Sequence, residues 1–130
     1  MTRIASLLLC ASVGLATPVA SADNAPPRID IILANFSLTP ANIQLAANAP
    51  VTLVLTNKGW EDHNFSAPEF FKAAEMDKVM RGRVGKKGKL NFFVGQTRYV
   101  TLTPKAGVYK VGCSQLLHAD FGMIGTITVK

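Results

Sequence analysis

One stretch of this chain limits its possible folds more than any other: Tyr109 to Val129, YKVGCSQLLHADFGMIGTITV. It carries Cys113, His118 and Met123 at even spacing, on a loop between two runs of β-branched residues that read as strands. The only other histidine is His63, within EDHNF, 50 residues before the cysteine. A fold that uses all four side chains together must bring a distant strand end against this loop.

The four side chains have the donor types of a copper site with two His, one Cys and a weakly bound axial Met. A thiolate is soft and suits Cu(I), an imidazole suits either oxidation state, and a distant thioether tunes the reduction potential. Three ligands on one short loop and a fourth from a distant strand make a rigid cage. We therefore expect one copper per chain, bound by His63, Cys113, His118 and Met123.

Each of these residues also has a purely structural interpretation. A free cysteine usually behaves as a small buried hydrophobe, and a methionine often fills a gap in a core. His63, taken alone, is typical of an ordinary turn histidine. The metal hypothesis depends on the combination of the four residue types rather than on any single position.

The N-terminus has the pattern of a secretory signal peptide. Arg3 precedes an apolar run from Ile4 to Ala16, and Ala20-Ser21-Ala22 is a small-residue cleavage site. We expect residues 1–22 to be removed and residues 23–130 to form one exported, periplasmic domain. No later segment approaches the roughly 20 apolar residues of a transmembrane helix.

Removal of that segment changes the cysteine count. Cys10 leaves with the signal peptide, and Cys113 remains as a lone thiol in a compartment where thiols tend to be oxidised. Metal ligation would protect such a thiol, which favours the copper site.

The remaining chain consists mostly of short runs rich in β-branched residues with turn signals between them. His63 follows the turn Asn57-Lys58-Gly59 and is placed at the end of a strand. Seven or eight short strands predict a single-domain, all-β, antiparallel sandwich. Strands are expected over Arg28–Phe36, Ile43–Leu45, Val51–Thr56, Leu90–Val94, Arg98–Leu102, Val108–Cys113 and Ile124–Val129.

A basic insertion interrupts the strand pattern. Apolar residues at three- and four-residue spacings predict one amphipathic helix over Glu69–Arg81, and the glycines from Gly82 onward are expected to end regular structure. Residues 72–89 hold seven Lys and Arg against two acidic residues, a net charge of +5. This segment is either a solvated face or a surface that steers the protein toward an acidic partner.

Two methionines in the insertion raise a second metal hypothesis. Met76 and Met80 are four residues apart on the predicted helix, and with Glu75 they would offer a softer Cu(I) site. A methionine pair at helical spacing is more often part of the core.

Taken together, VTLVLTNKG, HNF and GVYKVGCSQLLHADFGMIGTITV resemble the cupredoxin family of small type 1 blue-copper proteins, which includes plastocyanin and azurin. The resemblance implies a Greek-key β-sandwich with one copper on His63, Cys113, His118 and Met123. It also implies that Asn64 ties the two ligand loops together near the thiolate. The four spacer residues on each side of His118 are most similar to the loops of rusticyanin and auracyanin.

The resemblance implies one-electron transfer between partner proteins as the function. Copper transport, storage or delivery is the alternative, because HNF followed by PEFF resembles bacterial cupredoxin-like exported proteins, some associated with metal uptake. A cupredoxin-like fold without metal is a third hypothesis. We expect no enzyme activity, since the chain lacks a nucleophile elbow, a paired-His zinc motif and the extra His clusters of multicopper oxidases.

Redox partner proteins are expected to dock on the apolar face formed by Leu116, Leu117 and His118, or on the basic insertion. We expect no nucleic-acid partner, because the aromatic residues are not interleaved with the basic ones. The protein is expected to be a monomer.

Overall fold

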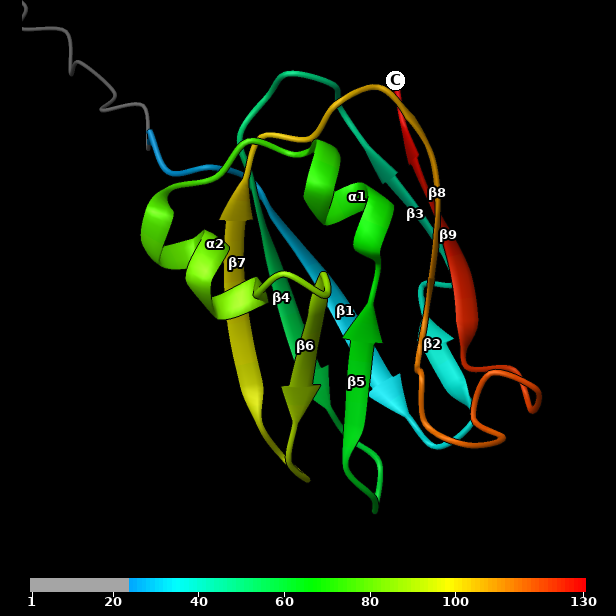
Figure 1. The fold of residues 1–130 in the computed structure, drawn as a ribbon. Coiled ribbons are helices and arrows are strands. Elements are labelled where there is room, and N and C mark those ends of the chain that lie inside the picture. The colour runs from blue at the N-terminus through cyan, green and yellow to red at the C-terminus, as the bar shows by residue number, and fades with distance from the viewer. Residues whose placement is uncertain (1–23) are drawn as a thin grey trace, which may run out of the picture.

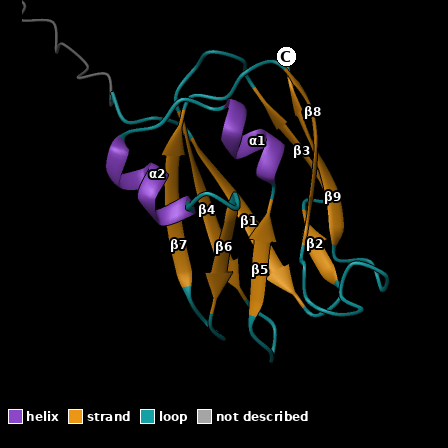
Figure 2. Cartoon of the chain, in the orientation of Figure 1, coloured by secondary structure: helices purple, strands orange, loops and turns teal. Residues whose placement is uncertain are grey.

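Two β-sheets lie face to face in the computed structural model, which describes residues 24–130 (Figure 1). The predicted signal peptide, its cleavage site and Cys10 lie outside the described residues. Strands form both layers, and two short helices lie outside them (Figure 2). The predicted all-β, single-domain sandwich is confirmed.

The first sheet has four strands in the order β2-β1-β4-β7. Along β4, buried residues alternate with half-buried ones, because successive side chains of a strand point to opposite faces. The strands are β1 (Arg28–Ala34), β2 (Ser37–Thr39), β4 (Val51–Asn57) and β7 (Thr97–Leu102).

The second sheet has five strands in the order β3-β9-β8-β5-β6. It places β5 beside β8 with Ser66 opposite Gly112, so the antiparallel arrangement brings the HNF segment alongside Cys113 and the residues after it. The strands are β3 (Asn42–Leu45), β5 (His63–Ser66), β6 (Lys89–Phe92), β8 (Gly107–Gly112) and β9 (Ile124–Val129).

The prediction of purely antiparallel pairing was wrong at two places. β1 pairs with β4 in parallel, and β3 pairs with β9 in parallel. The predicted first strand also stops at Ala34, because the chain turns at Phe36, whose φ is +61°. That turn allows Ser37–Thr39 to pair back on β1 as β2, a strand that was not among those predicted from the sequence.

The space between the sheets is filled by branched and aromatic side chains. The inward residues of β1, β4 and β9 are almost fully covered, as shown by Ile31, Leu53 and Ile127 at 0% exposure. Close packing of this kind, rather than any single contact, accounts for most of the stability of a small sandwich. The strand ends that carry the candidate ligands are therefore mounted on a rigid frame.

The predicted single helix over Glu69–Arg81 was wrong. The structure has α1 (Pro68–Ala73) and α2 (Lys78–Val84), separated by an extended segment around Glu75. Glu75 forms a β-bridge with Thr103, with N–H to carbonyl distances of 2.9 and 2.8 Å in the two directions. This tertiary pairing holds Glu75 extended, and the side chain of Asp77 accepts a hydrogen bond from Met80 N to begin α2.

The C-terminal end of α1 is held by an arginine of α2. The guanidinium of Arg81 donates to the carbonyl oxygens of Phe71 and Ala74, the latter at 2.6 Å. Carbonyls at a helix end lack partners within the helix, so a cation placed there satisfies them. Gly82, expected to end regular structure, lies inside α2 instead.

No helix among the described residues is long and apolar enough to cross a membrane. Both helices belong to the basic insertion and lie in the upper half of the view, whereas the loop after β8 is at the bottom right (Figure 1).

We expect the Arg81→Met variant to lose about 1–2 kcal/mol of unfolding free energy, because the α1 carbonyls lose charged donors. Urea unfolding of the copper-free protein measures the change. Arg83→Met is the matched control, since Arg83 is also exposed in α2 but its side chain makes no hydrogen bond or ion pair within residues 24–130. Equal losses in the two variants would contradict the capping role of Arg81.

Candidate metal centre

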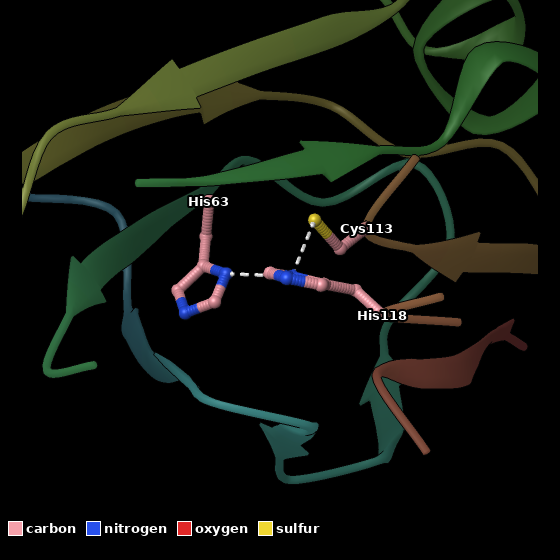
Figure 3. A group of neighbouring side chains, drawn as sticks. All are labelled: His63, Cys113 and His118. Atoms are coloured by element: carbon pink, nitrogen blue, oxygen red, sulfur yellow. Dashed lines mark hydrogen bonds between the residues drawn. The ribbon is translucent and has the colours of Figure 1, made fainter. Parts of the chain in front are cut away.

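Three potential metal ligands converge at one end of the sandwich. His63 is the first residue of β5, Cys113 follows the last residue of β8, and His118 lies in the loop between β8 and β9. One ligand atom from each residue lies within 4.8 Å of the other two. Figure 3 shows the three side chains pointing toward one another.

The donor atoms face one another at short range. His63 Nδ1 lies 3.1 Å from His118 Nδ1, and Cys113 Sγ lies 3.7 Å from the same nitrogen (Figure 3). All three side chains are buried, with exposed fractions of 1%, 2% and 8% for His63, Cys113 and His118. A sulfur and two ring nitrogens facing one shielded point are the donor set that suits copper or zinc.

Burial affects the protonation of His63. Removal from water lowers its pKa, and the nearby His118 lowers it further, against a smaller opposing effect of Glu61 and Asp62. A lowered pKa keeps the imidazole neutral at physiological pH. The ring is therefore available as a metal ligand without first losing a proton.

Packing fixes the ring of His63 from behind. A Cβ atom added at Gly59 would lie 2.6 Å from His63 Nε2 and would also collide with the side-chain oxygen of Asn35. Only a glycine leaves room for the ring at this point, so the turn before β5 and the position of His63 depend on each other.

Asn64 joins the two chain segments that carry the ligands. Its backbone N–H points at Cys113 Sγ at 3.5 Å, and its side-chain oxygen accepts hydrogen bonds from Ser114 N and Ser114 Oγ at 2.9 and 3.2 Å. The N–H directed at the sulfur helps to fix the position of the Cys113 side chain. This is the position in which the family resemblance placed Asn64.

Met123 closes the loop that holds His118. Its N–H donates to the carbonyl of His118, and its own carbonyl accepts from Cys113 N, both at 2.9 Å. The residue is fully buried. Hydrogen bonds on both sides of Met123 keep the ends of the ligand loop together.

Two aromatic residues that the sequence analysis did not assign to the site cover its edge. Phe36 packs edge-on against His118 and against Phe121, with ring centroids 5.5 Å apart in each pair. The loop approaches closely because Gly122, at φ +110°, lies against the carbonyl of Phe36. No local pattern in the sequence signals this contact, because it depends on the turn between β1 and β2.

Glu61 is a further site residue that sequence reasoning missed. Its carboxylate oxygen Oε2 lies 3.2 Å from His118 Nε2, on the side of the ring away from Cys113. The only available signal was its position two residues before His63 in EDHNF.

The second metal hypothesis requires the sulfurs of Met76 and Met80 to lie together, but the two residues lie in different surroundings. Met80 is buried in α2 and lines a hollow with Arg83 and Leu90, whereas Met76 lies before α2 and lines another with Glu75 and Asp77. The break in the predicted helix removes the spacing that would have aligned the two sulfurs.

Comparison with known proteins gives the context of this site. Residues 29–130 match the family model described as copper binding proteins, plastocyanin/azurin family. A sequence comparison with curated proteins found no match.

Solved structures share the fold. Na-dithionite reduced auracyanin from the photosynthetic bacterium Roseiflexus castenholzii is 16% identical with a TM-score of 0.60, over 82% of this chain and 99% of that chain. The "blue" copper protein auracyanin A from Chloroflexus aurantiacus is 17% identical with a TM-score of 0.56, over 82% of this chain and 100% of that chain. A multicopper oxidase from Campylobacter jejuni is 13% identical with a TM-score of 0.60, over 87% of this chain and 32% of that chain.

We expect Asn64→Ala to lower the unfolding free energy of the copper-free protein by about 1–3 kcal/mol, because two donors of Ser114 lose their acceptor. Denaturant unfolding measures the loss. Asn91→Ala is the control, since Asn91 is the exposed partner of Asn64 on β6. A loss no larger than that of the control would show that Asn64 does not join the two segments energetically.

Proposed function

Because the chain belongs to the plastocyanin/azurin family of copper binding proteins, with copper as its cofactor, we propose that it transfers single electrons between partner proteins. His63, Cys113, His118 and Met123 are the proposed ligands. The observation that carries the proposal is the convergence of one sulfur and two imidazole nitrogens in a buried cluster.

Copper supplies a one-electron couple when bound, and the protein supplies a cage that resists rearrangement. His63 and Cys113 are fixed to neighbouring strands of one sheet, and Met123 and His118 are tied by a backbone hydrogen bond. A cage that keeps its shape in both oxidation states lowers the reorganisation energy of electron transfer. A thiolate with two imidazoles and a weak axial Met is the ligand set of electron-transfer copper sites.

The family favours an electron carrier over an enzyme. The multicopper oxidase is similar to this chain over only 32% of its own length, and at 13% identity that likeness concerns the fold. Within the described residues, His63, Cys113 and His118 form the only cluster of three or more His, Cys, Asp or Glu side chains placed to hold a metal.

We further propose that the protein works outside the cytoplasm, in the periplasm. The signal-peptide pattern of residues 1–22 supports this location. Cys113 is the only cysteine after that segment and is buried, so it needs no disulfide partner there.

Electron exchange is proposed to occur at the end of the molecule that holds the ligand loop. Leu116, Leu117 and Phe121 are exposed on this loop by 86%, 52% and 63%, beside the buried His118. An exposed apolar patch of this kind marks a docking surface. His118 is then the ligand nearest to the partner.

The basic insertion is proposed as a second surface, which orients the protein toward acidic partners. The insertion follows the end of β5 that lies away from His63. Its role would therefore be long-range steering rather than direct contact at the copper site.

We expect the Cu(II)-loaded protein to show an intense thiolate-to-copper absorption band and a narrow hyperfine splitting in electron paramagnetic resonance, both bleached reversibly by a reductant. Cys113→Ser should lose the band entirely, because a hydroxyl cannot replace the thiolate donor. A weak, ordinary Cu(II) spectrum in the parent, or a colourless Cu(I) form that does not reoxidise, would favour copper transport, storage or delivery instead.

We expect Leu117→Glu to slow electron exchange with a redox partner at least several-fold while the visible spectrum stays unchanged, because the charge disrupts an apolar contact. Stopped-flow kinetics with an electron-transfer protein measures the rate. Val108→Glu is the control, since Val108 is 73% exposed but lies at the end of β8 away from Cys113. Equal rates in both variants would exclude the loop as the docking face.

A further inference from the structure

We propose that Glu61 is a positioning residue of the copper site, which selects the ligand nitrogen of His118 and stabilises Cu(II) relative to Cu(I). This inference rests on the proposed function, because it assigns a role toward the copper bound by His118. It concerns a residue outside the ligand set.

The ring of His118 has its two nitrogens in different surroundings. Nδ1 faces His63 Nδ1 at 3.1 Å and Cys113 Sγ at 3.7 Å, whereas Nε2 faces Glu61 Oε2 at 3.2 Å. A carboxylate only accepts hydrogen bonds, so Nε2 must carry the proton that Glu61 accepts. In a neutral imidazole, Nδ1 then keeps its lone pair and is the ligand atom.

A hydrogen bond holds the backbone of Glu61, which fixes the point from which its side chain extends. Asn57 is fully buried, and its side-chain amide donates to the carbonyl of Glu61 at 2.8 Å. The side-chain oxygen of Asn57 accepts from Gly59 N at 2.9 Å. The turn between β4 and β5 is therefore held from inside, and the Glu61 side chain reaches His118 from it.

The two histidines are held by different means. His63 belongs to β5 and is packed against Gly59, and its Nε2 has no hydrogen-bond partner in the described part of the chain. His118 lies on a loop, where no strand ladder fixes its ring. A carboxylate on the second nitrogen of a metal-binding histidine fixes both the tautomer and the ring orientation. Only His118 has such a partner in residues 24–130, and it is the histidine that needs one.

The charge of Glu61 has an additional effect. Its side chain is half-exposed, at 50%, and its carboxylate lies against the outer nitrogen of the His118 ring. A negative charge hydrogen-bonded to a ligand strengthens that ligand as a donor. Cu(II) carries one more positive charge than Cu(I), so Glu61 favours the oxidised form and lowers the reduction potential.

The test compares Glu61→Leu, which removes the hydrogen bond and the charge, with Glu61→Gln, which removes the charge but keeps an acceptor oxygen. Asp62→Asn is the matched control, because Asp62 is a neighbouring exposed carboxylate whose side chain accepts from Val94 N rather than from a histidine. Thermal unfolding of each copper-free variant establishes that it is folded.

Three measurements are made on these proteins. Competition with a chelator should give a Cu(II) affinity that is 10- to 100-fold weaker in Glu61→Leu, the range found when such partners are removed, and a smaller loss in Glu61→Gln. The reduction potential should rise in both Glu61 variants and by less in Asp62→Asn. Nitrogen NMR of the copper-free proteins at mildly alkaline pH should show His118 protonated on Nε2 in the parent and as a tautomer mixture in Glu61→Leu.

The proposal is overturned if Glu61→Leu keeps the Cu(II) affinity, the potential and the His118 tautomer of the Asp62→Asn control. Failure of the proposed function has a different signature. In that case the parent itself shows no reversible one-electron couple, while the NMR of the copper-free proteins still decides whether Glu61 sets the tautomer.

Discussion

The hydrogen bonds of Asn64 join two segments of chain that meet because β5 and β8 are neighbours in one sheet. Cys113 and Ser114 follow Asn64 in the sequence by 49 and 50 positions, yet both contact it. The Asn64 N–H points at the sulfur of Cys113, and the side-chain oxygen of Asn64 accepts a hydrogen bond from Ser114 N. The position of His63 beside Cys113 follows directly, since His63 precedes Asn64 on the strand. Closure of long chain segments costs entropy, and the buried core between the sheets offsets that cost. The metal centre is therefore a consequence of strand order.

The ligand loop is less regular than the strands, and it is stabilised by contacts of another kind. Backbone hydrogen bonds of Met123 with Cys113 and His118 close the loop. Phe36, in the turn after β1, packs against the His118 ring. The carboxylate of Glu61 approaches the outer nitrogen of the same ring. His118 thus lies where the rigid frame ends and the exposed apolar surface begins, which is the place proposed for electron exchange.

The two ends of the sandwich differ in chemistry. The end with the ligand loop exposes apolar side chains, among them Leu116 and Phe121, and carries the acidic Glu61 and Asp62. The helices of the basic insertion lie in the upper half of the view, away from the ligand loop (Figure 1). The proposed steering by charge and the proposed docking by apolar contact therefore involve different surfaces, so each could vary without disturbing the other.

The amino-acid sequence by itself determined the features that depend on local pattern and on donor chemistry. Alternating β-branched runs predicted the sandwich, and the residue types and spacing of Cys113, His118 and Met123 predicted a copper loop, with His63 named as its distant partner. Only the tertiary structure decided the features that depend on long-range pairing. The bridge from Glu75 to Thr103 divides the predicted helix. The pairing of Glu75 with a distant residue stabilises the extended backbone more than the weak helical preference of a short segment stabilises a helix. The parallel pairing of β1 with β4, and the approach of Phe36 and Glu61 to His118, come from turns that place distant residues together, and no local pattern in the sequence encodes that placement.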